Sequence, residues 1–535
     1  MVALFYTKIH NESFNFLDIA FQYTIYHIKN KLFTGGNNLM NYISTRGGGS
    51  PVSAARAIIK GLATDGGLFV PQTIPTIDRD FIQSLLDLSY QERAKKILSL
   101  YLTDFTMQEI NNCVENAYGH HKFDTEKVVP TVQVEDNNYL LELWHGPTSA
   151  FKDMALQLLP QFISTSLQKL GDKNELVILV ATSGDTGKAA LDGFKNVPQT
   201  KIIVFYPQEG VSKIQRLQML TQEGENIAVV AVKGNFDDAQ NGVKQIFNNT
   251  AYNELLAQKG FQLSSANSIN WGRLLPQIVY YFSSYADLIN MGKITLGDKV
   301  NFTVPTGNFG DILAGFYAKC MGLPVNRLIC ASNANNVLTD FLTTGTYDKN
   351  RKFYKTISPS MDILISSNLE RLLYHITNDT QKVSKWMQQL QQEGKYTVDE
   401  ATLKAIQETF CAGYLNDTDT MNCIKNIYTK DKYVADTHTA VAWQVAQDYT
   451  AKTGETIPMV ILSTASPYKF NDSVLTALGK NIANKDEFAL LDELAQVNKD
   501  PIPQGLAKLK TATILHNKVC EKQNMLHSVS EFLNI

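Results

Sequence analysis

The feature that most constrains this chain is a series of short apolar runs, each followed by a turn with glycine or other turn residues and a helical pattern. These runs lie at 175–181, 200–207, 226–234, 299–305 and 326–332, and a further apolar run lies at 457–465. Runs that are apolar throughout are typical of strands covered on both faces. Strands that alternate with helices favour parallel sheets with right-handed crossovers. The pattern therefore predicts an α/β fold.

Composition limits the partners of such a fold. The net charge is −3, which gives no electrostatic reason to expect nucleic acid or an anionic membrane as a partner. No run approaches the roughly 18 to 20 apolar residues that a membrane span needs. The 6 cysteines form no C-x-x-C pair, and none lies near a histidine at metal-ligand spacing. We therefore expect no metal site and a reducing, cytoplasmic location.

The first 39 residues differ from the rest of the chain. They are aromatic, are interrupted by charges and asparagines, and contain no compact apolar segment followed by a small-residue cleavage site. A signal peptide is therefore not indicated, and the acidic residues and the lack of arginine argue against a transit peptide. We interpret residues 1–39 as an extension of doubtful origin, with Met40 as the hypothetical natural start.

Two turns that follow buried strands are candidates for binding anions. In "VPTGNFGDILAGF", Gly307 and Gly310 bracket Asn308 and Phe309, and a helix is expected to start near Asp311. Glycines allow backbone N–H groups to turn inward, and the helix adds its positive end, which together favour a phosphate cradle. An ordinary strand-to-helix turn is the alternative.

The second turn is "VATSGDTGKAAL", at 180–191. It is not a P-loop, because Thr182 stands where the first glycine is needed and Ala189 stands where a serine or threonine should follow the lysine. A nucleotide triphosphatase is therefore rejected. The turn is rich in donors and suits a carboxylate or phosphate, although Ser183 or Asp185 could equally serve as a helix cap.

Lys152 stands at the expected start of an amphipathic helix, in "LWHGPTSAFKDMALQLLP". Most lysines are solvated surface groups, but a few are nucleophiles or cofactor anchors. A lysine together with two anion-binding turns suggests a cofactor that carries an aldehyde and a phosphate. Pyridoxal 5'-phosphate (PLP) fits that description.

The segments "LWHGPTSAFKDMA", "ATSGDTGKAAL" and "PTGNFGD", taken together, resemble threonine synthase, a family of fold-type II PLP enzymes. The segments 42–47, 61–75, 267–282 and 358–373 resemble further blocks of this family, in the right order, and the last two resemble its long form. The resemblance implies an α/β fold of the tryptophan synthase β type, with two parallel-sheet domains and a helical N-terminal region. It also implies conversion of O-phospho-L-homoserine and water to L-threonine and phosphate by γ-elimination and β-hydration, the last step of threonine biosynthesis.

The resemblance also implies roles for individual residues. Lys152 would form the Schiff base with PLP and serve as the mobile base. The other residues that would bind the cofactor are Phe151, Gly307, Asn308, Phe309, Gly310, Asp311 and Thr464. Those that would bind the substrate are Ser183, Asp185, Thr186 and Arg273.

One block departs from the family pattern. The family reads T-A-H-P-A-K-F, whereas this chain reads "TASPYKF", so Ser466 replaces the histidine and Tyr468 the second alanine. Thr464 keeps the hydroxyl expected near the pyridine nitrogen, and Lys469 is also present. The departure weakens any role assigned to Lys469. His438, in "DTHTAVAW", is interpreted as a capping or core histidine.

The predicted domains follow from the resemblance and the helical pattern near residues 80–120. After the extension come an N-terminal helical domain at 40–135, a large PLP-binding domain at 136–175 and 296–535, and a small α/β domain at 176–295. A monomer is expected, with a dimer as the alternative.

Three other functions are alternatives. A threonine or serine dehydratase fits the later blocks and the long helical N-terminal region less well. A catalytically silent relative that binds PLP or phosphorylated metabolites would not need Lys152, the phosphate loop and Thr464 together. A membrane-tethered scaffold would need an apolar span.

Overall fold

The computed structural model of this chain describes residues 39–119, 121–182, 184–209 and 211–535. Apart from Leu39, the N-terminal extension lies outside the described residues, and so does the predicted site residue Ser183. The expectations for both therefore stay predictions. All 6 cysteines lie within the described residues, and each is a free thiol. No helix of the described part is long and apolar enough to cross a membrane.

The larger of the two main sheets has six strands. In spatial order they are β13 (Phe410–Tyr414), β10 (Val325–Ser332), β9 (Val300–Pro305), β14 (Met459–Ser463), β4 (Asn138–Glu142) and β3 (Thr131–Glu135). All neighbouring pairs are parallel except β3 with β4. Every residue of β9 and β14 is buried, as is usual for strands of a helix-covered parallel sheet.

The second main sheet has five strands, all of them parallel. They are β15 (Lys518–Glu521), β7 (Ile227–Lys233), β6 (Thr200–Pro207), β5 (Glu175–Ala181) and β8 (Phe261–Ser264). Helices α8 (Asp185–Phe194) and α10 (Phe236–Asn248) pack against this sheet. The two sheets confirm the predicted α/β class.

Helices dominate the N-terminal segment, as the periodicity predicts. The main ones are α2 (Ala54–Lys60), α3 (Arg79–Gln83), α4 (Tyr90–Ser99) and α5 (Met107–Tyr118). α2 packs against α7 (Leu159–Leu170), and α4 packs against the buried α13 (Pro276–Asn290). The N-terminal helices are therefore attached directly to the helices that surround the two sheets.

The predicted domain boundaries stay predictions, but the strand pairing differs from them at two points. β3 comes from the segment assigned to the helical domain, yet it pairs with β4 in the six-stranded sheet. β15 comes from the C-terminal part of the segment assigned to the large domain, yet it pairs with β7 in the five-stranded sheet. β3 and β4 are neighbours in the chain, but the pairing of β7 with β15 joins segments that are distant in sequence, which local periodicity does not indicate.

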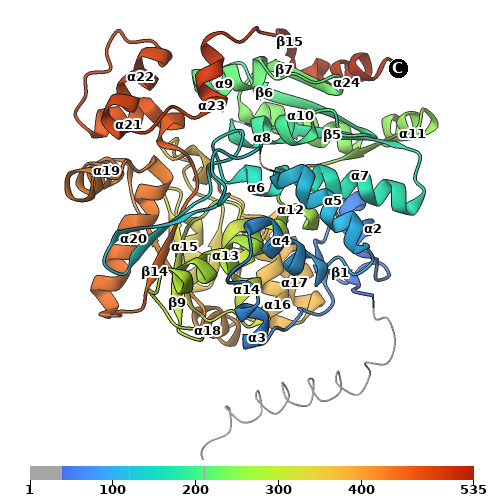
Figure 1. Cartoon of the computed structure of the whole chain (residues 1–535). Helices are drawn as coiled ribbons and strands as arrows, with labels where there is room; N and C mark the ends of the chain where they lie inside the picture. Colours follow the sequence, from blue (N-terminus) through green and yellow to red (C-terminus); the bar gives the residue numbers. More distant parts are fainter. Residues whose placement is uncertain (1–38, 120, 183, 210) are drawn as a thin grey trace, which may run out of the picture.

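The two sheets lie in different halves of the molecule. Figure 1 shows β5, β6 and β7 in the upper half and β9 and β14 in the lower half, with helix α6 (Lys152–Leu156) at the level between them. α6 contacts α8 of the upper half and α13 of the lower half. The carboxyl ends of β4, β5, β9 and β14 lead into the segments that hold the predicted site residues, as is usual in α/β folds.

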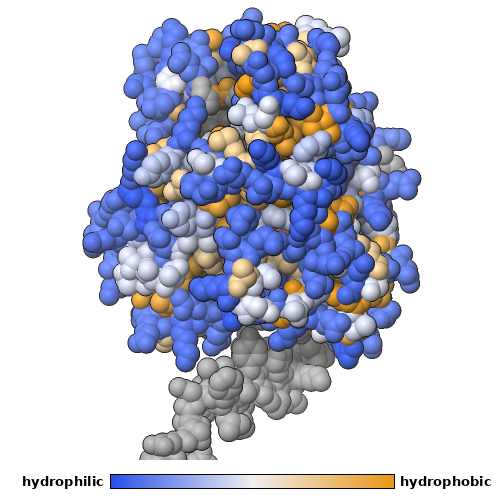
Figure 2. All heavy atoms as spheres, turned by 90° about the vertical axis from the view of Figure 1, so that its left-hand side faces the viewer, coloured by the Kyte–Doolittle hydropathy of each residue, from blue (hydrophilic) through white to orange (hydrophobic). Residues whose placement is uncertain are grey.

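The surface in Figure 2 is mostly hydrophilic, with hydrophobic side chains in scattered groups. The exposed large hydrophobic residues of the described part include Phe353, Tyr354 and Ile365. Scattered exposure of this kind is normal for globular proteins.

Candidate active site

Lys152 is the first residue of α6, and its side chain is partly buried. Its Nζ lies 3.3 Å from Oγ of Ser360 and 4.8 Å from the centre of the Phe151 ring. Ser360 belongs to the short 3-10 helix η1 (Pro359–Met361), more than 200 residues along the chain. The lysine therefore points into the fold rather than into solvent.

The surroundings of Lys152 favour the neutral form of its amine. Burial lowers the pKa of its amine to about 8, against an ordinary value of 10.5. The carboxylates of Asp185 and Asp153 oppose this shift, whereas the cations Arg273 and Lys469 add to it. A fraction of about a tenth of the amine is then neutral at pH 7, which a base or nucleophile requires.

The turn that carries Lys152 is fixed from two sides. The buried carboxylate of Asp153 accepts hydrogen bonds from the backbone N–H of Thr148 at 2.8 Å and from its hydroxyl at 2.6 Å. The N–H of Phe151 donates to the carbonyl of Thr464 at 2.8 Å. The lysine is thus held against the end of β14, although the two segments lie some 300 residues apart.

Asp185 is the first residue of α8, and it forms a buried ion pair with Lys469. Lys469 Nζ lies 2.6 Å from Oδ1 of Asp185, and the two side chains are 0% and 3% exposed. Gln215 Nε2 donates to the same oxygen at 2.8 Å, and Ser360 Oγ lies 3.4 Å from Oδ2. The amine of Lys469 also donates to the carbonyl of Thr148 at 2.9 Å. Lys469 and Lys152 together hold the pKa of Asp185 well below its ordinary value, so this carboxylate is ionised.

The turn before α8 is organised by Thr182, the residue that rules out a P-loop. Its Oγ1 accepts hydrogen bonds at 3.0 Å from the N–H groups of both Gly184 and Gly187. A Cβ on Gly184 would lie 2.5 Å from Oε1 of Gln215, so a side chain there would displace the Gln215 amide. Thr186 is partly exposed at the start of α8, beside Asp185.

The predicted phosphate loop joins β9 to α14 (Gly310–Met321), which begins at Gly310. The Asn308 carbonyl accepts two hydrogen bonds from Asn368, at 3.1 Å from its backbone N–H and at 3.0 Å from its side chain. The carbonyl of Gly307 accepts one from the Ser366 hydroxyl at 2.8 Å. These contacts hold the carbonyl groups of the loop.

The side chains of this loop are used for packing. Phe309 has a left-handed backbone with φ of 61°, and its buried ring lies 5.5 Å from that of Phe410. Asp311 is buried, and its Oδ1 accepts hydrogen bonds from the hydroxyls of Tyr280 at 2.5 Å and Tyr281 at 3.1 Å. Its Oδ2 is buried without a hydrogen-bond partner among the described residues. Burial raises the pKa of Asp311 to about 7.

Thr464 follows β14 and is buried. Close to it, the N–H of Ser466 donates to the carbonyl of Ser149 at 3.1 Å, and the hydroxyls of both serines are buried without a partner in the described part of the chain. Tyr468 turns away from this region, because its hydroxyl donates to the carbonyl of Asp500 at 2.5 Å. The residues that depart from the family pattern therefore leave Thr464 and Lys469 in the centre of the fold.

Arg273 lies in α12 (Trp271–Leu274) and is 7% exposed. Its Nη1 donates to the Ala266 carbonyl at 2.6 Å. No ion pair joins it to a carboxylate of the described residues. Burial lowers the pKa of its guanidinium to about 10, which still leaves it charged at neutral pH.

Two family models match the chain. The one described as Threonine synthase N terminus matches residues 41–118, and the one described as Threonine synthase, C-terminal matches residues 439–517. Threonine synthase from Schizosaccharomyces pombe is 39% identical over 469 residues, which cover 82% of this chain and 89% of that protein. The chain belongs to the threonine synthase family.

The fold agrees with that assignment. The structure of PLP-bound threonine synthase from Brucella melitensis matches with a TM-score of 0.82 at 38% identity, covering 92% of this chain and 98% of that one. This confirms the predicted fold-type II architecture. Threonine synthase-like 1 from Homo sapiens is 40% identical over 458 residues, which cover 84% of this chain. The present chain spans 61% of the length of that human relative.

Sequence reasoning assigned no role to three residues that contact the candidate site residues of this threonine synthase family member. Ser360 lies in the recognised block 358–373 but received no role, although it contacts both Lys152 and Asp185. Lys469 was doubted because its neighbours depart from the family pattern, yet it is the ion-pair partner of Asp185. A single sequence carries no signal for Gln215, because its contact with Asp185 arises from the packing of α9 (Lys213–Leu220) against α8.

Proposed function

We propose that this chain is a PLP-dependent threonine synthase, a carbon–oxygen lyase that converts O-phospho-L-homoserine and water to L-threonine and phosphate. The observation that carries the proposal is Lys152, an amine with a lowered pKa held at the carboxyl ends of strands from both sheets. Membership of the threonine synthase family supports the choice of reaction.

The residues present fit PLP. Lys152 offers an amine for its aldehyde, and the 305–311 loop offers the N-terminus of α14 for its phosphate. A Cβ on Gly307 would lie 2.7 Å from the carbonyl oxygen of Ser360, so the chain leaves no space for a side chain at this position. Two cations, Lys469 and Arg273, and the ionised carboxylate of Asp185 surround Lys152. Together with the charge of the lysine itself they leave a positive balance suited to anions.

PLP, when bound, supplies an aldehyde for amines and a ring that accepts the electron pair left when a proton leaves carbon. Lys152 would hold it, with Gly307, Asn308, Phe309 and Gly310 contributing backbone groups at the phosphate. Phe151 lies beside the lysine, and Thr464 presents a hydroxyl rather than a carboxylate at the end of β14. A neutral hydroxyl would leave the ring nitrogen unprotonated and so restrain side reactions.

Lys152 is proposed to move the protons of the reaction. Its neutral amine takes the proton from Cα of the substrate, a second proton leaves Cβ, and phosphate departs from Cγ with the electron pair of its bond. One proton is then returned to Cγ and one to Cα, which replaces the two that were removed. Water adds its hydroxyl at Cβ, and its remaining proton goes to the released phosphate. Proton transfers at neighbouring carbons suit a single mobile base, and Lys152 is the one that the site offers.

The substrate would bring a carboxylate and a phosphate. Arg273 is proposed to bind one of these groups, because its buried guanidinium has donors beyond the one used by Ala266. Ser183 and Thr186 would contribute hydroxyls at the start of α8. Asp185 would act on the substrate through its neighbours, since its oxygens are engaged by Lys469, Gln215 and Ser360.

The decisive experiment measures release of phosphate and threonine from O-phospho-L-homoserine with PLP present. Wild type should release both in equal amounts, and Lys152→Ala should lose at least about a thousandfold in kcat, because both the anchor and the base are removed. Uptake of PLP by wild type without either product would contradict the proposed reaction. Threonine and serine would then be tested as substrates, with a 2-oxo acid as product.

The role of Arg273 has its own test. Arg273→Ala should raise KM for O-phospho-L-homoserine about a hundredfold, since a charge-assisted contact to the substrate is lost. Arg93→Ala provides a control, because Arg93 is a buried arginine that pairs with Asp287 in the helical region. It should affect stability with little change in KM. Unchanged kinetics in Arg273→Ala would remove this residue from the site.

A second candidate is a relative that binds PLP without making threonine. It is favoured by the 40% identity to a protein named Threonine synthase-like 1, which is considerably longer than this chain. The product assay separates the two candidates. A monomer and a cytoplasmic location are proposed in addition, with gel filtration and cell fractionation as their tests.

A further inference from the structure

The hydroxyl and the carbonyl of Ser360 contact different parts of the candidate site. Its hydroxyl lies 3.3 Å from Nζ of Lys152 and 3.4 Å from Oδ2 of Asp185. It can accept a hydrogen bond from the amine and donate one to the carboxylate, so it joins the two. Its carbonyl faces Gly307 of the phosphate loop. One residue of η1 thus touches Lys152, Asp185 and the phosphate loop.

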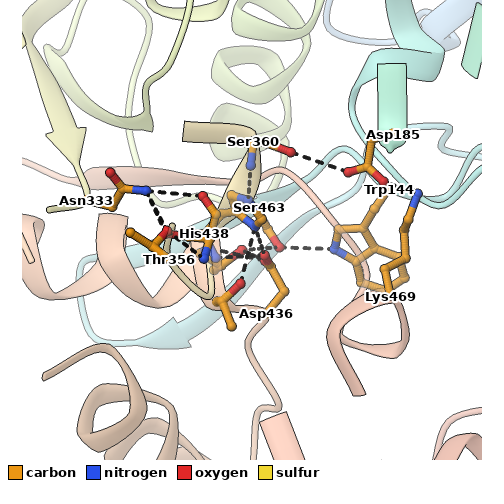
Figure 3. Close-up of polar contacts among 12 residues, drawn as sticks. Trp144, Asp185, Asn333, Thr356, Ser360, Asp436, His438, Ser463 and Lys469 are labelled. Atoms are coloured by element: carbon orange, nitrogen blue, oxygen red, sulfur yellow. Dashed lines mark hydrogen bonds and ion pairs between the residues drawn. The ribbon is translucent and has the colours of Figure 1, made fainter. Parts of the chain in front are cut away.

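The position of Ser360 depends on a histidine in another helix. The backbone N–H of Ser360 lies 3.1 Å from Nε2 of His438, at the start of α20 (Thr437–Thr453). Since the N–H can only donate, Nε2 must accept, and the ring proton must lie on Nδ1. Nδ1 lies 2.8 Å from Oδ1 of Asp436. Figure 3 shows this sequence of contacts, from Asp436 through His438 to Ser360 and Asp185.

The Asp436–His438 pair is buried and held by several contacts. Both side chains are buried, at 0% and 2% exposure. Asp436 also caps α20, because it accepts hydrogen bonds from the N–H groups of His438 at 2.8 Å and Thr439 at 3.2 Å. The ring of His438 lies 4.8 Å from that of Phe470, next to Lys469 in η2 (Pro467–Phe470). The carboxylate therefore fixes the tautomer as well as the place of the ring.

We propose, on the basis of the proposed function, that Asp436 and His438 are positioning residues for the lysine step. They hold the backbone of Ser360 so that its hydroxyl joins the amine of Lys152 to the carboxylate of Asp185. The neutral imidazole is required, because a second proton on Nε2 would face the N–H of Ser360. Ser360 itself touches the reacting amine.

A cap or a core histidine would account for the burial of these residues, but not for the direction of the contacts. A cap needs only the carboxylate of Asp436. It does not require a ring between Asp436 and Ser360, or a serine hydroxyl placed between Lys152 and Asp185. The two interpretations differ in whether changes at His438 reach Lys152 through Ser360.

The test measures the amine of Lys152 directly, in the full chain without PLP. Competitive acetylation with acetic anhydride, read by mass spectrometry against pH, gives the midpoint of the titration of this amine. Ser360→Ala should lower the midpoint by about one unit, because the ammonium loses one hydrogen-bond acceptor. His438→Leu should lower it by a similar amount. His438→Gln should stay near wild type, because its amide oxygen can accept from the N–H of Ser360.

The double variant decides between the two interpretations. If His438 acts through Ser360, then Ser360→Ala combined with His438→Leu lowers the midpoint no further than Ser360→Ala alone. Asp436→Asn keeps an oxygen for the helix cap but weakens the hold on Nδ1, so it should lower the midpoint in a variant that still folds. An unchanged or raised midpoint in His438→Leu and Asp436→Asn would overturn the proposal, as would additive shifts in the double variant.

His375→Leu is the matched control. His375 is a partly buried histidine of α16 (Leu369–Thr377) whose Nε2 lies 2.7 Å from the hydroxyl of Tyr317. Its loss should lower stability and leave the Lys152 midpoint at its wild-type value. Because the labelling uses no PLP or substrate, a failed product assay would overturn the proposed function without changing this result. If wild type makes threonine in full yield but the His438 and Asp436 variants leave the Lys152 midpoint unchanged, this inference alone would be overturned.

Discussion

The two glycine-containing turns of this protein begin alike and are used differently. Each follows a buried strand, and in each an aspartate stands at the start of the next helix, Asp185 in α8 and Asp311 in α14. Asp185 is paired with Lys469, and its pKa lies well below the ordinary value. Asp311 accepts hydrogen bonds from two tyrosines, and burial raises its pKa to about 7.

The difference shows that position on a helix does not decide the charge of a carboxyl group. The positive end of a helix favours the ionised form at both places, but only by a modest amount. Desolvation opposes ionisation at both places, and a neighbouring cation in contact decides the outcome. Lys469 supplies that contact for Asp185 alone. One turn therefore carries a paired charge, whereas the other is proposed to bind phosphate through its backbone.

Removal of Lys469 should destabilise the first turn, which precedes α8, and has the largest expected effect on stability. Lys469→Met leaves Asp185 buried without its cation, which should cost about 3 to 5 kcal/mol in the free energy of unfolding, measured by denaturant titration. Lys233→Met is the control, because its pair with Glu521 lies on the surface, with exposures of 57% and 46%. It should change the unfolding curve little. Equal effects of the two variants would show that the buried pair does not hold the turn.

A side chain at Gly307 should disrupt the second turn and leave the Asp185–Lys469 ion pair of the first in place. Gly307→Ala places a Cβ 2.7 Å from the Ser360 carbonyl, so one segment must move. PLP should then bind about tenfold more weakly or worse, as measured by titration of cofactor absorbance, with the Asp185 pair intact. Gly454→Ala is the control: it has φ of 69° and nothing within 4 Å, so it should cost stability but no affinity for PLP. Wild-type affinity in Gly307→Ala would contradict a backbone phosphate site.

The smallest expected effect is a difference in pH dependence between the two aspartates. The folded-state pKa of Asp311 is raised from 3.8 to about 7, so the native state binds this proton more tightly than the unfolded chain does. Wild type should therefore lose stability as pH rises from about 4 to about 7. Asp311→Asn lacks this loss, so its stability relative to wild type should rise through that window and then level off.

Asp185→Asn should show the opposite sign. The folded-state pKa of Asp185 is lowered, so its contribution is present above the ordinary value near 3.8 and is lost as pH falls below it. Denaturant unfolding of wild type and both variants between pH 3 and pH 8 would show the two trends. Parallel curves for the two variants would remove the contrast between the turns.

Much of the site could be predicted from sequence because its residues lie in short continuous motifs. Lys152 and the two turns were identified in this way, and the predicted fold class is confirmed. The roles assigned to Lys152, Phe151, Thr464 and Arg273 and to the residues of both turns stay predictions. Ser360 and Lys469 were not assigned, since their contacts join segments between 175 and more than 300 residues apart. His438 was interpreted as a cap or core residue, and only its contact with Ser360 suggests more.

The sequence by itself determined the alternation of strands and helices, the glycine turns at the carboxyl ends of strands, and the lysine that stands beside them. These depend on apolar periodicity and on backbone freedom, which are local properties. Only the tertiary structure decided which charges meet: Lys469 with Asp185, Ser360 with Lys152, and the two tyrosines with Asp311. Ionisation depends on burial and on neighbours within a few ångströms, and these neighbours come from segments that only the folded chain brings together.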